Sequence, residues 1–243
     1  MTSPKLARLE ALRHQLITEA VLGPAIAVAA LDVPAIDAVL PWRGLPCGAV
    51  HEVAGAALDG AATGFCSMLL ARLAGDGRSV LWVCPQDDLY GPGLVRFGLK
   101  AERLIVVRAH RPAEILWVIE EALRCRGLAA VLGEVSALSP TASRRLQLAA
   151  RKSGVTALLL RQSAAAPVTT AVTRWHVVAA SGPKQDASLA PRWRVDLVRC
   201  RGLLHGEEGY VSRWLVAWEA DRLAVAPDLR DRPAIAAPYR MAR

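Results

Sequence analysis

The stretch that decides the fold is Gly44-Leu45-Pro46-Cys47-Gly48-Ala49-Val50-His51-Glu52-Val53-Ala54-Gly55. It has the pattern of a tight turn, a strand over 49–54 and a glycine that opens a loop, after which a helical pattern begins at residue 61. From there, strand and helix patterns alternate to about residue 160. Such alternation is typical of βαβ units, so we predict an α/β fold with a mostly parallel sheet flanked by helices.

The pattern changes after residue 160. Four segments, 175–180, 193–200, 210–219 and 223–226, alternate with period two and are separated by turn residues. They predict an antiparallel C-terminal extension of the same sheet. We therefore expect three parts: an N-terminal helix and strand extension (1–31), one core domain (32–226) and a flexible C-terminal tail (227–243).

Composition excludes several classes of protein. The chain has 243 residues, of which 53% are hydrophobic and 21% charged, so it can bury a core and is not disordered. The longest apolar run, 20–31, contains Gly23-Pro24 and is too short to span a bilayer. No secretory signal is apparent, and the five cysteines have no metal-ligand spacing. We expect a cytoplasmic protein without a membrane partner or a metal site.

Charge is placed unevenly along the chain. Residues 131–243 contain 17 Lys and Arg against 9 Asp and Glu, which accounts for the whole net charge of +8. A basic half of this kind suits an acidic partner, either nucleic acid or an anionic protein surface. Basic and aromatic residues do not interleave, so a platform for stacked bases is not expected. Direct contact with DNA stays open at this point.

The loop after the first core strand lacks the chemistry of a phosphate-binding loop. Such a loop needs G-x-x-x-x-G-K-[ST], in which backbone N–H groups and the Lys hold the phosphates and the hydroxyl ligates Mg²⁺. This chain has Gly55, Gly60, Thr63 and Gly64 in a degenerate version with no Lys or Arg, and Asp59 adds a negative charge. We therefore expect no bound cofactor.

The turn, the hydrophobic-Glu-hydrophobic triplet and the loop resemble the corresponding segment of RecA-type recombinases, which implies a RecA-like core. In that resemblance, Gln86 stands at the catalytic Glu position, and Gln cannot accept a proton from water. Gly133 stands at the metal-supporting Asp position, and Glu134 would face the other side of the strand. Segment 163–167 is too short to form the second DNA-contacting loop. These losses predict that the protein is not an ATPase.

Further motifs across about residues 40–220 resemble the ImuA family, which is RecA-like and related to the cell-division inhibitor SulA. They are "LPWRGLPCGAVHEVAG", "AATGF", "VLWV", "LYGPGL", "RPAEILWVIEEALRC", "LSPTASRRLQLAARKSGVTALLLR" and "PRWRVDLVRCRG". The resemblance implies an accessory role in SOS-induced, mutagenic translesion DNA synthesis. Its implied partners are ImuB, which is a polymerase homologue without catalytic carboxylates, and an error-prone replicative-type polymerase. We expect a non-catalytic protein that acts through contacts with these proteins and with RecA.

Two groups of residues are candidates for partner binding. An amphipathic helix over 5–20 places Leu6, Leu9 and Leu16 on one stripe, which could dock a RecA-fold partner or fold back on the core. Arg199 and Arg201 match a basic pair with which RecA-type subunits reach the ATP of a neighbour, and their spacing places them on one sheet face. The competing interpretation is a solvent-exposed pair on an edge strand.

Other functions stay possible on the sequence alone. They are weak ATP hydrolysis with an atypical loop, SulA-like inhibition of cell division, and direct binding of single-stranded DNA. For individual residues, the structural interpretation is preferred: His51 and Glu52 point to opposite faces of a strand, and Trp82 and Trp117 are expected in the core.

Overall fold

The computed structural model describes residues 27–56, 60–75, 77–161, 170–181, 190–203 and 211–226. The predicted N-terminal helix with Leu6, Leu9 and Leu16 and the tail 227–243 lie outside these ranges, as does segment 163–167. What the sequence predicts for these segments, and the domain boundaries that depend on them, therefore stay predictions. None of the helices in the described ranges is long and apolar enough to cross a membrane.

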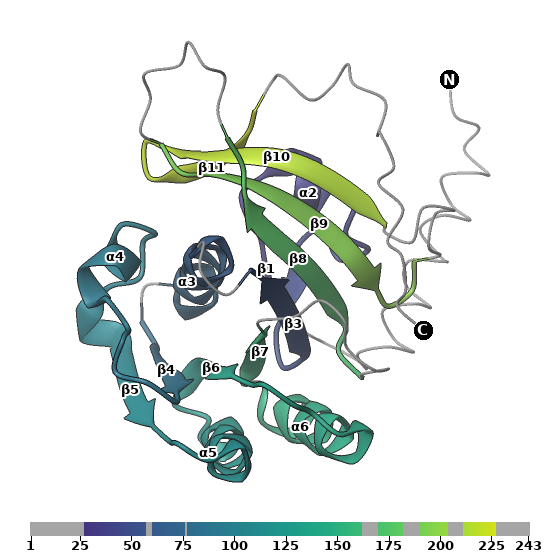
Figure 1. The fold of residues 1–243 in the computed structure, drawn as a ribbon. Helices are drawn as coiled ribbons and strands as arrows, with labels where there is room; N and C mark the ends of the chain where they lie inside the picture. The colour runs from purple at the N-terminus through teal and green to yellow at the C-terminus, as the bar shows by residue number, and fades with distance from the viewer. Residues whose placement is uncertain are drawn as a thin grey trace, which may run out of the picture.

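A nine-stranded sheet organises the chain, with the order β11-β10-β9-β8-β3-β7-β6-β4-β5 (Figure 1). Its strands are β3 (Val50–Gly55), β4 (Ser79–Cys84), β5 (Leu104–Arg108), β6 (Leu128–Glu134), β7 (Thr156–Arg161), β8 (Thr173–Ala179), β9 (Arg192–Cys200), β10 (Ser212–Glu219) and β11 (Arg222–Val225). All pairings from β8 to β5 are parallel, and those from β8 to β11 are antiparallel. The predicted α/β class with a mostly parallel sheet and an antiparallel C-terminal extension is confirmed.

One strand direction differs from the prediction. The segment expected as the first antiparallel strand is β8, which pairs in parallel with β3, with His51 opposite Thr173, and only its other edge is antiparallel. β3 therefore lies between β7 and β8, and all three run the same way. Alternation of side chains along a strand indicates which side is buried but not the direction of the strand. The sequence could therefore not distinguish a parallel from an antiparallel pairing of β8 with β3.

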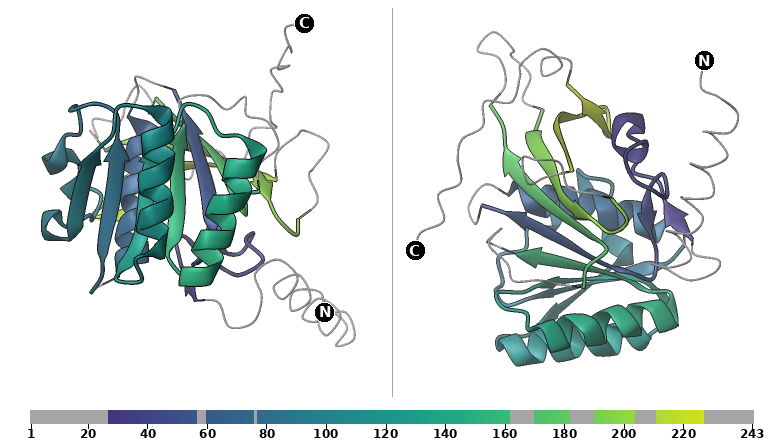
Figure 2. Two further views of the ribbon diagram at one scale, coloured as in Figure 1. Left: turned by 90° about the horizontal axis from the view of Figure 1, so that it is seen from below. Right: turned by 90° about the vertical axis from the view of Figure 1, so that its right-hand side faces the viewer.

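Helices cover the two faces unequally. α5 (Pro112–Arg124) and α6 (Pro140–Ser153) lie side by side on one face (Figure 2), and their apolar side chains form one core with β3, β6 and β7. α3 (Ala61–Ala74) lies on the other face. The smaller elements are α2 (Pro34–Asp37), α4 (Gly91–Val95), the 3-10 helix η1 (Ala101–Arg103), and β1 (Val28–Ala29) paired with β2 (Leu45–Pro46).

α3 is buried on nearly every side because the sheet curls around it. Phe65 at its centre packs with ring centroids 5.8 Å from Trp175 on β8 and 6.4 Å from Trp193 on β9. Trp82, on β4, is fully buried as predicted, whereas Trp117 on α5 is 63% exposed, so its predicted place in the core is wrong. The apolar stripe of α5 is formed by Ile115, Ile119 and Leu123, and residue 117 points away from it.

A buried histidine ties β3 to its neighbours. The Trp175 indole donates to the Thr173 hydroxyl (2.8 Å), which in turn lies 2.7 Å from His51 Nδ1, while His51 Nε2 lies 3.0 Å from the Pro46 carbonyl. One consistent assignment has Nε2 donating to Pro46 and Nδ1 accepting from the hydroxyl, which is the neutral imidazole. Burial lowers the pKa of His51 to about 4, so its role is structural, as predicted.

Candidate functional site

A pocket of about 510 Å³ opens at the carboxyl ends of the parallel strands. This is the edge where ligands bind in open α/β sheets. All four residues of the predicted degenerate loop, Gly55, Gly60, Thr63 and Gly64, line it. The structure therefore brings the loop residues together at the place where the sequence predicted them, between β3 and the start of α3.

Two of the glycines of this site, Gly55 and Gly64, are needed by the protein's own packing. A Cβ on Gly55 would lie 2.5 Å from Ala62 Cβ and 2.6 Å from the Val177 carbonyl oxygen. A Cβ on Gly64 would lie 2.8 Å from the indole of Trp193. In a phosphate-binding loop, glycines let the backbone approach the phosphates. Here the close approach at both positions is to β8 and β9 of the same chain.

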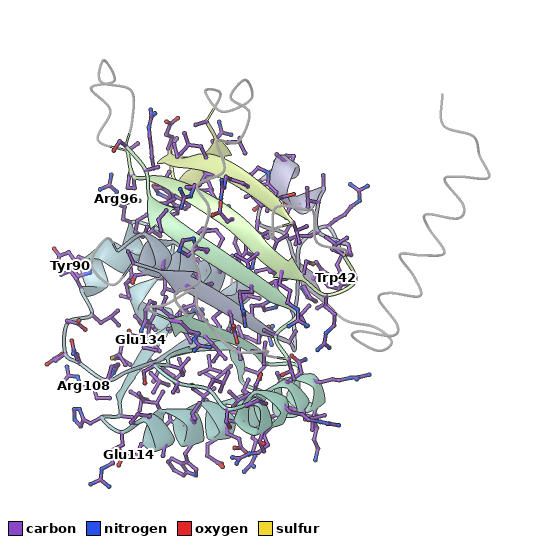
Figure 3. The ribbon with its side chains drawn as sticks, turned by 45° about the vertical axis from the view of Figure 1, so that its right-hand side comes forward. Trp42, Tyr90, Arg96, Arg108, Glu114 and Glu134 are labelled. Atoms are coloured by element: carbon purple, nitrogen blue, oxygen red, sulfur yellow. The ribbon has the colours of Figure 1, made fainter. Side chains whose placement is uncertain are left out.

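The pocket has a carboxylate at the end of β6. Glu134, at the end of β6, lines the pocket together with Tyr90 (Figure 3), and its Oε1 accepts a hydrogen bond from Trp82 Nε1 (2.8 Å). Burial is the main cause that raises the pKa of Glu134, and the charge of Asp88 adds to it. Burial of the Cys66 side chain and, secondly, the charge of Glu134 raise the pKa of the Cys66 thiol. This end of the pocket disfavours further negative charge.

Gly133 and Glu134 face the opposite sides of the sheet from those expected from the sequence, which placed residue 133 at the site and Glu134 away from it. Gly133 faces α5, where an added Cβ would overlap Ile119 Cδ1, and it does not line the pocket. Glu134 faces the α3 side and does line it. The apparent alignment of Gly133 with a metal-supporting Asp therefore does not correspond to a position in the pocket, and Glu134 is the site residue that sequence reasoning set aside.

Gln86 is also outside the pocket. It is exposed in the turn after β4, while its neighbours Pro85 and Asp88 line the pocket. Asp87 forms an ion pair with Arg108 on β5, so it is a surface residue. No cluster of three or more His, Cys, Asp and Glu side chains that could hold a metal ion occurs within the described part of the chain.

Arg161 is a pocket residue that the sequence did not single out as a ligand group. It ends β7, is 6% exposed, and its Nε and Nη1 have no hydrogen-bond partner in the structure. The sequence could have identified Arg161 as a pocket residue, because a charged residue at the end of an apolar parallel strand lies at the ligand-binding edge of the sheet. Arg161 stands on a strand, however, and does not restore a cation to the loop.

The second predicted pair, Arg199 and Arg201, lies away from this pocket. Arg199 is the penultimate residue of β9, and Arg201 follows the strand, where its Nη2 donates to the Thr170 carbonyl (3.0 Å). Partial burial and, secondly, the charge of Arg199 lower the pKa of Arg201, so the two guanidinium groups are near one another. The structure thus brings this pair together, and it adds Arg144 and Arg151 of α6, which line a small groove with Arg201.

Comparison with known proteins identifies the family. No family model matches the chain. A crystal structure of SulA from Pseudomonas aeruginosa aligns with a TM-score of 0.41 and 27% identity, covering 46% of this chain and 96% of that one. The ImuA proteins of two strains of Caulobacter vibrioides are 42% identical to this chain over an alignment of 187 residues that covers 70% of this chain and 77% of each relative. With the quoted motifs and this coverage, the chain belongs to the ImuA family.

Proposed function

We propose that the protein is a non-catalytic accessory factor of SOS-induced, mutagenic translesion DNA synthesis. It acts through contacts with ImuB, an error-prone replicative-type polymerase and RecA. Membership of the ImuA family associates the chain with the ImuA and ImuB mutagenesis system. The observation that carries the non-catalytic role is the pocket, whose loop has no Lys or Arg and whose inner end holds the carboxylate of Glu134.

A RecA-like origin of the core is part of this proposal. In support of it, the central strand β3 leads through a glycine loop into α3, and the pocket lies where a nucleotide would bind in such a core. The antiparallel strands β9, β10 and β11 follow the parallel part, as the period-two alternation of their segments predicted.

The purified protein is expected neither to bind nor to hydrolyse ATP. Without a Lys to neutralise the phosphates, we expect an affinity for Mg²⁺-ATP weaker than about 1 mM in equilibrium titration with labelled nucleotide. Ala62→Lys alone should not produce hydrolysis, because Gln86 lies outside the pocket and the carboxylate that does line it, Glu134, accepts a hydrogen bond from Trp82 and has a pKa raised by burial. Turnover by the unmodified protein that disappears when Thr63 is replaced by Val would contradict the proposal.

Exposed apolar side chains at the β5 end of the sheet support a role in protein contacts. Ile105 and Val106 on the edge strand β5, with Tyr90 and Val95 at α4 and Trp117 on α5, are between 44% and 72% exposed. An edge strand with unpaired backbone groups and apolar side chains favours association with another protein. Affinity capture with the full-length protein, tested separately against ImuB, the polymerase and RecA, checks the proposed partners; failure to retain any of them would reject the proposal.

For the proposed contact with RecA, the double variant Arg199→Ala/Arg201→Ala is expected to weaken binding of ATP-loaded RecA at least tenfold. Permanently charged guanidinium groups grip phosphate oxygens, and each buried contact of this kind contributes about 1.5–3 kcal/mol. The role proposed for the pair is to reach the ATP of a RecA subunit and cap the end of its filament. Titration of labelled RecA with and without ATP measures the effect. Binding that ignores the nucleotide, or a folded double variant with unchanged affinity, would reject capping.

The N-terminal stripe of Leu6, Leu9 and Leu16 is proposed as a second RecA contact. A protein that begins at Asp32 tests it: if that shorter chain is folded and binds RecA as well as the full chain does, the helix is not the contact.

A further inference from the structure

We propose that an arginine-rich face, formed by the open side of β8, β9 and β10 and the adjoining groove of α6, binds the phosphate backbone of duplex DNA. The face consists of Arg144, Arg151, Arg174, Arg192, Arg194, Arg199, Arg201 and Arg213. α5 and α6 cover the parallel strands on this side of the sheet, whereas α3 packs against β8 and β9 from the opposite side, and none of the described helices covers β8 to β10 on the open side (Figure 1).

Strand register places the sheet arginines together. Trp193, Val195 and Leu197 of β9 turn toward α3 and the core, so Arg192, Arg194 and Asp196 turn to the open side. Arg213 on β10 is opposite Asp196, and Arg174 on β8 is opposite Arg199. The shift of register between Arg174 and Trp175 keeps Arg199 on the same open side beyond the irregularity.

Two buried carboxylates lie beneath the arginines of this face. Glu52 is 1% exposed and accepts from Arg174 Nε (2.9 Å). Asp196 is also buried, and it lies 2.6 Å from Arg213 Nε and 3.5 Å from Arg194 Nε. These carboxylates orient the guanidinium groups of Arg174, Arg194 and Arg213. Among the described residues of this side, arginines outnumber acids even when the exposed Glu219 at the end of β10 is included, so the side carries a net positive charge.

The groove at the edge of this face contains cations without acidic partners. It has a volume of about 290 Å³ and is lined by Arg144, Gln147, Leu148, Arg151, Thr170 and Arg201. Arg144 and Arg151 are seven residues apart on α6, and hence on one side of the helix. Neither side chain forms a hydrogen bond or ion pair with any residue that the structure describes.

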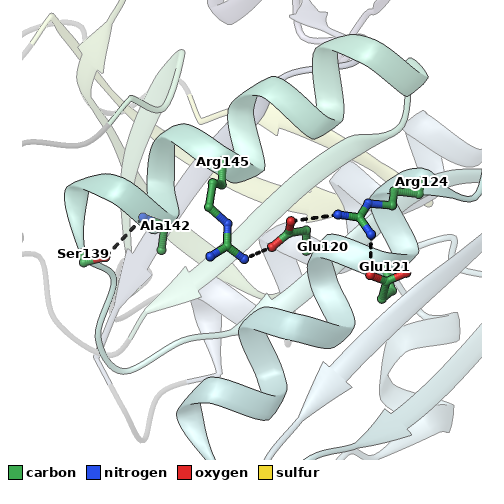
Figure 4. A network of polar contacts seen from close by, with 6 residues as sticks. All are labelled: Glu120, Glu121, Arg124, Ser139, Ala142 and Arg145. Atoms are coloured by element: carbon green, nitrogen blue, oxygen red, sulfur yellow. Dashed lines mark hydrogen bonds and ion pairs between the residues drawn. The ribbon is translucent and has the colours of Figure 1, made fainter.

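On the other side of α6, the arginine is paired with an acidic residue. Arg145 bonds to Glu120 of α5, and that carboxylate is shared with Arg124, which also bonds to Glu121 (Figure 4). The arginines between the two helices are thus neutralised within the protein. Those that face the groove are left for an external anion, which would also relieve the repulsion between Arg199 and Arg201.

Duplex DNA fits this face better than single strands. Single-strand binders combine a basic groove with aromatic side chains on which bases stack. The exposed aromatic residues of the described chain, Tyr90 and Trp117, lie at the other end of the sheet, and Trp214 of β10 packs on the core side. A duplex keeps its bases inside and presents phosphates, for which bidentate guanidinium contacts are suited.

Fluorescence anisotropy of the full-length protein with a labelled duplex of about 30 base pairs, between about 50 and 200 mM salt, tests the proposal. We expect binding that is independent of sequence and weakens steeply with salt. The variant Arg144→Gln/Arg151→Gln/Arg194→Gln should lose at least about tenfold at low salt and reduce the salt slope by about 2–3. It retains Arg199 and Arg201, so its result is separate from the RecA test.

The matched control is Arg96→Gln/Lys100→Gln/Arg126→Gln, which removes the same charge from exposed positions outside the arginine-rich face. It should bind the duplex within about threefold of the unmodified protein. Equal weakening by both triple variants would overturn the proposal, as would absence of duplex binding at about 50 mM salt. Tighter binding of the single strand, or of a polyglutamate peptide, through the same arginines would also overturn it. If circular dichroism shows the triple variant unfolded, Arg144→Gln and Arg151→Gln at the helix surface provide the test.

Discussion

Gly133→Asp is expected to destabilise the protein by at least about 4 kcal/mol, the largest effect of any substitution considered for the pocket. A Cβ at this position would overlap Ile119 Cδ1 and lie 2.8 Å from Ile119 Cγ1, and Ile119 is completely buried. Overpacking alone costs about 1–3 kcal/mol, and an unpaired carboxylate in an apolar core adds several more. Urea unfolding followed by circular dichroism measures the loss.

Two companion variants separate the causes. Gly133→Ala should show the steric part alone, about 1–3 kcal/mol. Glu134→Gln, one residue along the strand, keeps an acceptor for Trp82 Nε1 and should change stability by less than about 1 kcal/mol. A Gly133→Asp protein as stable as the unmodified chain that also binds Mg²⁺ would show that residue 133 does face the pocket.

The second large effect concerns pH and His51. Its pKa is about 4 in the folded protein, below the ordinary value of 6.5, because burial disfavours the imidazolium. Above pH 6.5, the imidazole is neutral in both states and stability is unaffected. Between pH 6.5 and 4, the unfolded chain binds a proton that the folded chain does not, so the free energy of unfolding falls by about 3 kcal/mol.

Urea unfolding at several pH values between about 7 and 4 reveals this contribution when the protein is compared with His51→Gln. The variant is less stable at pH 7, since it loses hydrogen bonds to Thr173 and Pro46, but its stability should depend on pH by about 3 kcal/mol less. His110→Gln at the surface serves as control and should retain the full pH dependence. Parallel pH curves for the unmodified protein and His51→Gln would rule out the buried neutral histidine.

The fold was predictable where local patterns are sufficient. Apolar strands alternating with amphipathic helices identified the parallel sheet, and period-two segments identified the antiparallel extension. The direction of β8 relative to β3 was not predictable, since the alternation of apolar residues is the same in a parallel and an antiparallel strand. Trp117 was predictable but missed: the stripe Ile115, Ile119, Leu123 already places residue 117 on the exposed side.

The site was predictable in position but not in detail. Glycine spacing located the loop, and its missing Lys was visible in the sequence. Which of Gly133 and Glu134 faces the pocket depends on how β6 is registered against β4 and β7, and a shift of one residue exchanges the two faces. The arginine face could not be found either, because it combines strand ends and a helix that are far apart in sequence.

The position of β3 between β7 and β8 has a consequence for biosynthesis. Its two neighbours are Thr156–Arg161 and Thr173–Ala179, so the strand formed by Val50–Gly55 has no hydrogen-bonding partner until more than a hundred further residues have left the ribosome. Pairing over such separations makes folding slow and exposes unpaired edges to aggregation. A nascent chain interrupted after β6 would contain β3, α3 and β4 but could not close the centre of the sheet, so this part of the fold can form only after β7 and β8 have been synthesised.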